Sequence, residues 1–393
     1  MAVSSLPRMS LTFDRESRLL TMSSGVPTLG IIGAGQLAQM SLAPAAALGI
    51  ELQILSSHSQ ESAAKFFPAS IGDYRDLDQL ISFASECDVI TFEHELVPNG
   101  HVRRLEELGH VVRPSSRALL HAQDKAHMRQ SFQQAGLPQP EWKVITDAEE
   151  IASYPVILKA ISGGYDGRGV RLATDSDQAR QALDQWSRAL CEKVVPFSRE
   201  LSIMIARSPH NQVSTWAVTE TVQRDGICVQ TISPAPNLEE SLAFRAQEIA
   251  LAIAEHIQLV GVMAVELFEV DGELLINEIA LRPHNSGHWT IEGANTSQFE
   301  QHLRAVLDLP LGSTTLNARW AVMGNVLGTQ KSDLYRPYLH LFARDPEIKV
   351  HNYAKEVRPG RKVGHVCAIG DDLDALRTRV SHAVDYISGV ISE

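Results

Sequence analysis

The side chains best suited to chemistry are concentrated in one stretch, ELLINEIALRPHNSGHWT at residues 273–290. Proline fixes φ and glycine relaxes it, so Pro283 and Gly287 predict a rigid, non-helical loop after an apolar strand. A loop with a carboxylate at one end and planar cationic or amide groups at the other is suited to bind a metal-bound phosphate beside an oxygen-rich substrate. The alternative is a polar loop without such a function. The side chains concerned are Asn277, Glu278, Arg282, His284, Asn285 and His288.

A second carboxylate, Glu266, precedes Glu278 in a segment that reads as a β-hairpin turning at Asp271-Gly272. A two-residue loop would pair Glu266 with Asn277. A three-residue loop through Glu273 would pair it with Glu278 on one face, with Cβ atoms roughly 4.5–5.5 Å apart. Facing carboxylates repel unless a cation lies between them, and Mg²⁺ (or Mn²⁺) prefers carboxylate and phosphate oxygens. We predict the three-residue loop and the shared ion; the alternative is that one glutamate is a solvated strand residue.

A glycine-rich loop, SGGYDGRGV at 162–170, follows Lys159 at the end of an apolar strand. Without bulky side chains, backbone N–H groups can approach phosphate oxygens, and a lysine adds a point charge. A Walker motif would instead require GxxxxGK[ST] at the start of a helix. The returning strand, Val170–Ala173, completes a hairpin that we predict to cover phosphates; a mobile surface hairpin is the alternative.

The segments before residue 120 alternate between apolar strands and helices, which predicts a parallel sheet covered on both faces. Gly33-x-Gly35 matches only part of a dinucleotide-binding motif, because Ala38 stands at the third glycine and no acid ends the second strand. NAD binding is therefore a minor alternative. Glu93, in TFEHE, follows a strand at the sheet edge where ligands bind. The strands are Thr28–Ile32, Ile50–Leu55 and Asp88–Phe92.

From residue 123 the pattern changes, and helices and strands alternate less regularly. Gly136 is expected to cap a helix over 124–135, with Pro138 beyond it. An α/β fold, α+β in part, is predicted. Further elements are a strand at 155–160, strand-rich 201–233, and helices at 238–257 and 373–387. The expected division is an extension at 1–25 and domains at 26–120, 121–320 (with a small subdomain at about 124–190) and 321–393.

Composition restricts the classes of function. The 393 residues are 44% hydrophobic and 21% charged, which is typical of a soluble globular protein of two or three domains. A net charge of −12 argues against general nucleic-acid binding, so an anionic ligand requires local cationic clusters. Lys355, Arg358, Arg361 and Lys362 form such a cluster, for which a solvated charged turn is the alternative.

Neither a membrane span nor a secretory signal is expected. No apolar run approaches the roughly 18–20 residues that a transmembrane helix needs. Residues 1–25 carry scattered charges and read as a disordered extension, within which Met9 or Met22 could be the true start. The four cysteines have no metal or disulfide spacing, which favours a reducing cytoplasm. They are Cys87, Cys191, Cys228 and Cys367.

The segment at 277–290 is close to NEIAPRPHNSGHWT, and it resembles the ATP-grasp family, in particular the branch that carboxylates 5-aminoimidazole ribonucleotide. The resemblance extends through several motifs from Thr28 to about Val366. It implies an N-terminal preATP-grasp domain, an ATP-grasp domain with a small lid subdomain, and a C-terminal extension. It also implies a cytoplasmic homodimer.

The implied activity is that of a ligase forming a C–N bond in de novo purine biosynthesis. ATP, bicarbonate and 5-aminoimidazole ribonucleotide would give N5-carboxyaminoimidazole ribonucleotide, ADP and phosphate through carboxyphosphate. The glycine-rich lid would close over this labile intermediate. Formate-dependent glycinamide ribonucleotide transformylation is an alternative with the same fold, but the NSGH run at 285–288 resembles the bicarbonate enzymes. A nucleotide-binding regulatory paralogue without turnover is a second alternative.

Site roles follow from the resemblance alone. The implied catalytic residues are Arg282, which would hold bicarbonate, and Tyr165, Asp166, His284 and Asn285. Implied ATP contacts are Lys125, Lys159, Gly163, Gly164, Gly167, Arg168, Gly169, Glu192, Val195, Glu200, Gln223, Asn277 and Glu278. Implied substrate contacts are Gln36, Leu37, Glu93, Lys355, Arg361 and Lys362, and the metal ligands are Glu266 and Glu278.

Three positions depart from the family pattern. Lys125 occupies a position where the family usually has an arginine. Gln223 replaces a histidine, and Leu281 replaces a proline. A lysine keeps the positive charge but cannot make the two parallel hydrogen bonds of a guanidinium. We therefore expect Lys125 to affect the affinity for ATP more than the rate of the chemical step.

Overall fold

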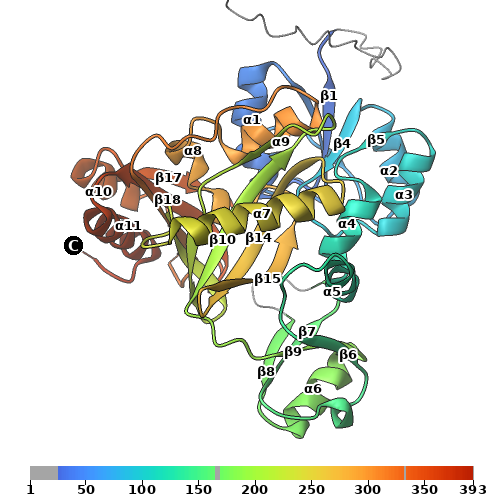
Figure 1. Ribbon diagram of the computed structural model, residues 1–393. Coiled ribbons are helices and arrows are strands. Elements are labelled where there is room, and N and C mark those ends of the chain that lie inside the picture. The colour runs from blue at the N-terminus through green and yellow to red at the C-terminus, as the bar shows by residue number, and fades with distance from the viewer. Residues whose placement is uncertain (1–24, 164–168, 332, 393) are drawn as a thin grey trace, which may run out of the picture.

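The N-terminal region forms a five-stranded parallel sheet in the order β3-β2-β1-β4-β5. The computed structural model describes residues 25–163, 169–331 and 333–392 (Figure 1). Both faces of the sheet are buried: Ile32 packs with α2 and α3, and Ile31 packs with α1 and α9. This confirms the parallel sheet. Its strands are β1 (Thr28–Ile32), β2 (Glu51–Ser56), β3 (Ser70–Ile71), β4 (Val89–Phe92) and β5 (Val111–Val112); the helices are α1 (Gln36–Leu48), η1 (Ala63–Lys65), α2 (Leu77–Ala84) and α3 (Asn99–Glu107).

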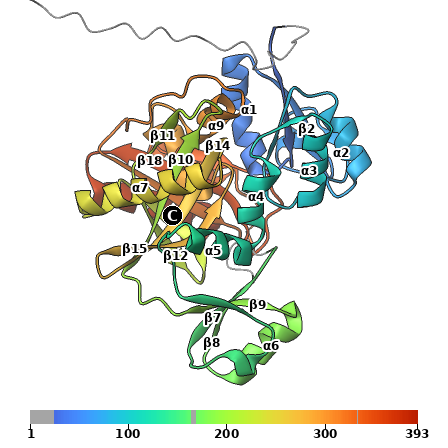
Figure 2. The same ribbon diagram turned by 45° about the vertical axis from the view of Figure 1, so that its right-hand side comes forward.

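A small antiparallel sheet projects from the body of the molecule (Figures 1 and 2). Its strand order is β6-β9-β7-β8, and helix α6 covers one face with Ala179, Ala182 and Leu183. Lys159 pairs with Val170, so the hairpin expected around the glycine-rich loop is present. The elements are β6 (Trp142–Ile145), η2 (Ala148–Glu150), β7 (Val156–Ala160), β8 (Val170–Ala173), α6 (Ser176–Trp186) and β9 (Ala189–Lys193).

The third sheet is antiparallel and forms the centre of the molecule, in the order β15-β14-β10-β12-β13-β16-β18-β17, with β11 beside β10. β16 pairs with β13, so strands from the last quarter of the chain continue the sheet begun by β10. The strands are β10 (Arg199–Arg207), β11 (Val213–Thr215), β12 (Thr219–Arg224), β13 (Ile227–Ser233), β14 (Gly261–Val270), β15 (Glu273–Ala280), β16 (Trp320–Leu327), β17 (Lys349–Asn352) and β18 (Lys362–Gly370).

Helices pack around this sheet and join it to the other two. Ile249 and Ile253 of α7 belong to the same buried cluster as Ile203 and Ile205 of β10, and α11 packs through Val380 with β16 and β18. Within the described residues, no helix is both long and apolar enough to cross a bilayer. The helices are α4 (Ser116–Gln123), α5 (Lys125–Gln134), α7 (Glu240–His256), α8 (Thr290–Gly293), α9 (Gln298–Val306), α10 (Pro337–Arg344) and α11 (Leu373–Ser388).

The β14–β15 hairpin pairs Glu266 with Glu278 as predicted, but the predicted loop is wrong. Val270 pairs with Glu273, so the loop has two residues rather than three. Its Asp271 and Gly272 have φ of 50° and 80°, as a type I′ turn requires. The shift in register comes instead from an irregularity beyond Glu266, where Leu267 pairs with Ile276. Asn277 is therefore the extra residue of a β-bulge.

The bulge decides which side chains reach the same face. In a regular strand, neighbouring side chains point to opposite faces, so Asn277 and Glu278 would be separated. Here Asn277 donates to the Glu266 carboxylate (Nδ2 to Oε2, 3.4 Å), while Glu278 pairs directly with Glu266 across the strands. One inserted residue thus brings an amide and two carboxylates together.

We expect Gly272→Ala to destabilise the protein, because a Cβ in the left-handed region is strained. Space around Gly272 is open, so the effect is conformational and costs about 1–2 kcal/mol. Gly100→Ala in α3 is the matched control: its Cβ would also meet open space, and a change within about 1 kcal/mol, in the stabilising direction, is expected. Urea unfolding measures both; an equal response would contradict the type I′ requirement.

Candidate active site

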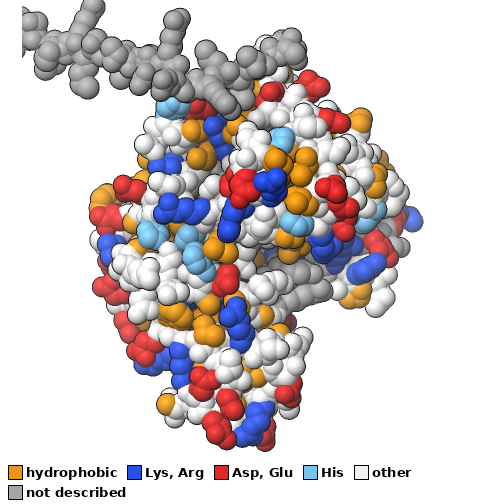
Figure 3. Space-filling model, turned by 90° about the vertical axis from the view of Figure 1, so that its right-hand side faces the viewer, with side chains coloured by type: hydrophobic (Ala, Val, Ile, Leu, Met, Phe, Trp, Pro, Cys, Tyr) orange, Lys and Arg blue, Asp and Glu red, His pale blue; other side chains and the backbone are white. Residues whose placement is uncertain are grey.

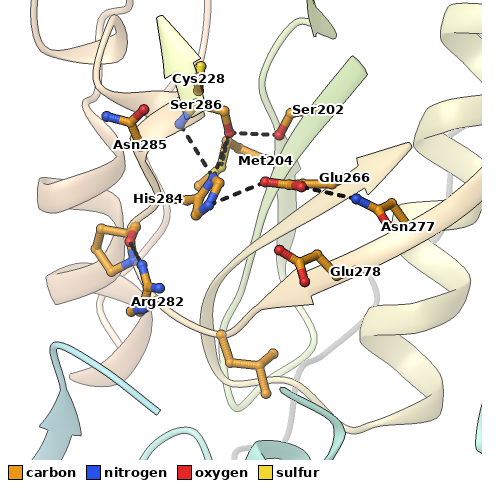
Figure 4. A network of polar contacts seen from close by, with 12 residues as sticks. Ser202, Met204, Cys228, Glu266, Asn277, Glu278, Arg282, His284, Asn285 and Ser286 are labelled. Atoms are coloured by element: carbon orange, nitrogen blue, oxygen red, sulfur yellow. Dashed lines mark hydrogen bonds and ion pairs between the residues drawn. The ribbon is translucent and has the colours of Figure 1, made fainter. Parts of the chain in front are cut away.

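The paired carboxylates lie at the centre of a connected set of polar side chains (Figure 4). Glu266 contacts Asn277 on one side and His284 on the other, with His284 Nε2 3.5 Å from Glu266 Oε1. Glu278 pairs with Lys125, whose Nζ lies 3.3 Å from Oε2. The side chain of Glu278 remains 43% exposed, whereas that of Glu266 is 22% exposed. The pair therefore opens to solvent on the side of Glu278.

The two carboxylates differ in their tendency to ionise. Burial, then the charges of Glu278 and Glu200, raises the pKa of Glu266 above its ordinary value. Burial also acts to raise the pKa of Glu278, but Lys125 and Lys159 outweigh it, and the pKa is lowered. Burial and Glu278 raise the pKa of Glu200 to about 7. A protein that holds carboxylates this close together provides a site where a cation relieves repulsion.

The donor set of this pair fits a divalent ion that shares its coordination with phosphate. Among the residues described, no three His, Cys, Asp or Glu side chains converge as a metal cage. An ion on Glu266 and Glu278 would thus complete its shell with ligand oxygens and water, as Mg²⁺ does in phosphoryl-transfer sites. The ring of His284 contacts Glu266, whereas the ring of His288 contacts Gln298.

A buried ion-pair network underlies the carboxylate pair. Lys159 Nζ contacts Glu192 Oε2 at 2.8 Å and donates to Asn277 Oδ1 at 2.9 Å. Arg129 donates to Glu192 from the opposite side, at 2.7 Å from Nε to Oε1. Burial would raise the pKa of Glu192, but Lys159 and Arg129 together hold it below the ordinary value. Lys159 and Arg129 thus share the Glu192 carboxylate between them.

Arg129 is a residue that the sequence reasoning missed. Its side chain is fully buried and also donates to the carbonyls of Ile276 and Asn277, at 2.8 and 2.7 Å. These bonds satisfy backbone groups next to the bulge, so Arg129 supports the strand that carries Glu278. The available signal was its position: Arg129 follows Lys125 by one helical turn in α5, so both cations share a face.

The loop after β15 is held by partners from distant parts of the chain. Arg282 Nε donates to Glu95 Oε2 at 2.8 Å, and Leu281 N–H donates to Glu95 Oε1 at 3.3 Å. A proline at 281 would have no N–H for the second bond, so this departure from the family pattern adds a contact. Asn285 exchanges two amide hydrogen bonds with Asn325 of β16, at 2.9 and 2.7 Å.

The local conformation of that loop differs from the expectation in one respect. Asn285–Gly287 forms a turn of 3₁₀ helix rather than a wholly non-helical loop. Gly287 is also required for a reason other than freedom of φ, because a Cβ there would lie 2.7 Å from Gln298 Oε1. His284 caps the turn, and its Nδ1 contacts Ser286 Oγ at 2.9 Å.

At the N-terminal sheet, Glu93 faces the start of α1. Its carboxylate accepts the N–H groups of Gly35 and Leu37, at 2.8 and 3.1 Å. A Cβ on Gly35 would lie 2.2 Å from Glu93 Oε1, so the glycine permits this close approach. The carboxylate thus occupies the helix N-terminus that a dinucleotide pyrophosphate would use, which argues against NAD.

The C-terminal basic cluster is divided by the structure. Arg358 pairs with the exposed Glu356, and Arg361 Nη1 donates to the Glu356 carbonyl at 3.2 Å. Lys362 begins β18, and its charge acts on Glu266. Lys355 lies with Nζ 5.6 Å from the centre of the Tyr353 ring. The charge of Lys362 thus reaches the carboxylate pair.

The loop that carries Lys355 is tied to the N-terminal region. Lys65 Nζ donates to the Ala354 carbonyl at 2.5 Å, and Gln39 Nε2 donates to the Asn352 carbonyl at 3.0 Å. Ala354 has φ of 52°, an unfavourable conformation for a residue with a Cβ. These contacts bring the first and last parts of the chain together beside the site.

The residues expected to contact ATP lie on several different elements. Glu192 lies within β9 between β6 and β7, and Val195 follows that strand. Glu200 lies on β10 opposite Thr221 of β12, and Gln223 lies at an irregularity of β12. Gly163 and Gly169 flank the glycine-rich loop, whereas Gly164, Tyr165, Asp166, Gly167 and Arg168 lie outside the described residues.

Models of three protein families match successive parts of the chain. A ribonucleotide synthetase preATP-grasp domain matches residues 26–123, an ATP-grasp domain matches 130–299, and a phosphoribosylaminoimidazole carboxylase C-terminal domain matches 321–379. The fold is thus that of an ATP-grasp protein.

Individual relatives agree over nearly the whole chain. The N5-carboxyaminoimidazole ribonucleotide synthase of Mycobacterium tuberculosis is 48% identical over 377 residues, covering 92% of this chain and 88% of the relative. The solved N5-carboxyaminoimidazole ribonucleotide synthetase of Thermus thermophilus has a TM-score of 0.82 at 35% identity, covering 93% and 99% of the two chains. An Aspergillus clavatus structure, in complex with ADP and 5-aminoimidazole ribonucleotide, has a TM-score of 0.83 at 27% identity over 93% and 99%. The chain belongs to the N5-carboxyaminoimidazole ribonucleotide synthase family.

We expect Arg129→Met to destabilise the protein by about 3–5 kcal/mol, because it leaves Glu192 and two backbone carbonyls with missing partners in a buried site. Arg104→Met is the control, since Arg104 forms an exposed pair with Glu107 and its loss should change stability by less than about 1 kcal/mol. The midpoint of urea unfolding distinguishes them. Similar small shifts for both variants would show that the buried network contributes little.

Proposed function

We propose that this chain carboxylates 5-aminoimidazole ribonucleotide with ATP and bicarbonate, giving N5-carboxyaminoimidazole ribonucleotide, ADP and phosphate in purine biosynthesis. The observation that carries the proposal is the facing pair Glu266 and Glu278 above the cationic network of Lys159 and Arg129. Phosphoryl transfer requires positioning and charge stabilisation more than covalent chemistry, and this arrangement supplies both.

Glu266 and Glu278 are the proposed ligands of Mg²⁺, which would neutralise charge on the phosphates of ATP. Lys159 is the proposed phosphate contact, and Glu192 and Asn277 hold its Nζ in place beside the carboxylate pair. Lys125 and Asn277 hold Glu278 and Glu266 in place from the two sides. Glu200, Gln223, Val195 and the glycine-rich segment are proposed to complete the nucleotide pocket.

Arg282 is the proposed bicarbonate ligand. Glu95 accepts from its Nε at 2.8 Å and the Pro283 carbonyl accepts from its Nη1 at 3.1 Å, and these bonds fix the plane of a guanidinium whose shape suits a planar anion. A bicarbonate oxygen would attack the γ-phosphorus of ATP, ADP would leave, and carboxyphosphate would form. His284 and Asn285 are proposed to orient the amine of the ribonucleotide, which then attacks the carboxyl carbon as phosphate departs. Tyr165 and Asp166 are proposed to assist from the lid.

The phosphate of the ribonucleotide is proposed to bind Lys355, Arg361 and Lys362. The charge of Lys362 acts on Glu266, which supports a position for this lysine close to the carboxylate pair. Gln36, Leu37 and Glu93 are proposed to contact the substrate from the start of α1. We also propose a cytoplasmic homodimer, from the family resemblance; four cysteines without disulfides among the described residues agree with a reducing compartment.

The space-filling view agrees with local rather than global recognition of anions. Acidic and basic side chains are interspersed over the face in Figure 3, in a chain of net charge −12. This face presents no broad positive field to a polyanion, which is consistent with phosphate groups being bound by individual cations of the site.

We expect ADP formation only when 5-aminoimidazole ribonucleotide and bicarbonate are both present, because each provides one of the two nucleophiles. ADP release by a coupled assay, with bicarbonate removed from the buffer, measures this. Glycinamide ribonucleotide with formate is the control substrate pair. ADP formed with the control pair would favour the transformylase, and no turnover with either pair would favour a regulatory paralogue.

We expect Lys355→Ala to raise KM for the ribonucleotide mainly, with a loss of about 1.5–3 kcal/mol in kcat/KM and little change in KM for ATP. Lys349→Ala on the edge strand β17 is the matched control and should change neither constant. Arg282→Ala should instead lower kcat as well as kcat/KM, because its charge acts during transfer. If Lys355→Ala raises KM for ATP and leaves KM for the ribonucleotide unchanged, the proposed orientation of the site is wrong.

A further inference from the structure

Gln298, the first residue of α9, holds the backbone of the site loop from both sides. The side chain is fully buried. Its Oε1 accepts the His284 N–H at 2.7 Å, and its Nε2 donates to the His284 carbonyl at 2.8 Å. The same Nε2 contacts His288 Nδ1 at 2.9 Å. The Gln298 amide therefore fixes the loop at two positions, His284 and His288.

The direction of these bonds follows from the backbone. The N–H of His284 can only donate and its carbonyl can only accept, so the amide of Gln298 has one orientation. Its second N–H must then donate to His288 Nδ1. A ring nitrogen that accepts a hydrogen bond carries no proton, so neutral His288 holds its proton on Nε2.

Other contacts support this tautomer and the tightness of the clamp. Burial, then nearby positive groups, holds the pKa of His288 well below its ordinary value, which keeps the ring neutral. Gly287 packs so closely on the Gln298 amide that a Cβ would lie 2.7 Å away. Thr290 Oγ1 accepts from Gln298 N at 2.9 Å and donates to the Gly287 carbonyl at 2.6 Å, closing the ring of bonds.

We propose that Gln298 is a positioning residue of the carboxylation reaction, which sets the path of the loop carrying Arg282, His284 and Asn285. This rests on the proposed function. The loop places the His284 ring against Glu266 and the Asn285 amide against Asn325. A displacement of about 1 Å in such groups can lower a rate roughly 100-fold, because reacting atoms must be aligned.

Two substitutions remove different parts of the clamp. Gln298→Met keeps the length of the side chain and loses all three bonds. Gln298→Glu keeps an acceptor for the His284 N–H but cannot donate to the His284 carbonyl or to His288. Both should lower kcat about 100-fold with KM for ATP unchanged, because alignment rather than nucleotide binding is lost.

Gln301 provides a matched control in the same helix. It is also fully buried and holds Gly312 in the same way, with Nε2 to the carbonyl at 2.9 Å and Oε1 accepting from N at 2.8 Å. Gln301→Met should lower the thermal midpoint as Gln298→Met does, yet leave kcat unchanged. An equal fall in kcat for both variants, or none for Gln298→Met, would overturn the proposal.

The imidazole tautomer gives a readout that does not depend on turnover. The ¹⁵N spectrum of the wild type should show His288 protonated on Nε2 alone, and Gln298→Glu should move the proton to Nδ1 or charge the ring. A wild-type His288 protonated on Nδ1 would refute the clamp even if both variants were slow. If the wild type instead turns over a different substrate, the proposed function fails, and the same kcat ratios measured with that substrate decide the role of Gln298.

Discussion

The repulsion between Glu266 and Glu278 is the constraint around which the site is organised. Two carboxylates held opposite each other in adjacent strands oppose folding unless neighbours offset their charge. Lys125 contacts one member, and Asn277 and His284 contact the other. Below them, Lys159 is kept in place by an anion, Glu192, that Arg129 in turn neutralises. The neighbours reduce the repulsion without closing the exposed side, so a cation with its own anionic ligands can complete the balance.

The bulge at Asn277 allows neighbouring side chains to offset the charge of the Glu266 and Glu278 carboxylates. A regular hairpin would send Asn277 and Glu278 to opposite faces, and only one could take part. The extra residue lets the amide reach both Lys159 and Glu266 while Glu278 stays opposite Glu266. Bulges interrupt the ladder, and the buried guanidinium of Arg129 supplies donors to the carbonyls of Ile276 and Asn277 there. The β-bulge and the buried Arg129 therefore depend on each other.

Local sequence patterns predicted much of the fold, but only part of the arrangement of the bulge, the carboxylate pair and Arg129. Strand Thr28–Ile32 was predictable because a strand buried on both faces reads as a continuous apolar run. The pairing of Glu266 with Glu278 was predicted, but through a longer loop, because a bulge has no clear signal in sequence. Glu95 and Gln298 could not be assigned, since their roles depend on partners far away along the chain. Arg129 was missed although it lies one helical turn after Lys125, because its partner Glu192 is also distant in sequence. Nor did sequence show that β16 would extend the sheet of β13.

The loop after β15 explains why the site needs the whole chain. Glu95 from the turn after β4 orients Arg282, Gln298 from α9 fixes His284, and Asn325 from β16 holds Asn285. A loop so short cannot define its own conformation, because it buries too little apolar surface to offset the entropy of ordering it. Each anchor fixes a different residue, so shifting any one of the three regions would move one reactive group relative to the others. Anchors that are themselves fixed by the surrounding fold meet this requirement better than the loop alone could, which accounts for a site assembled where three sequence-distant regions converge.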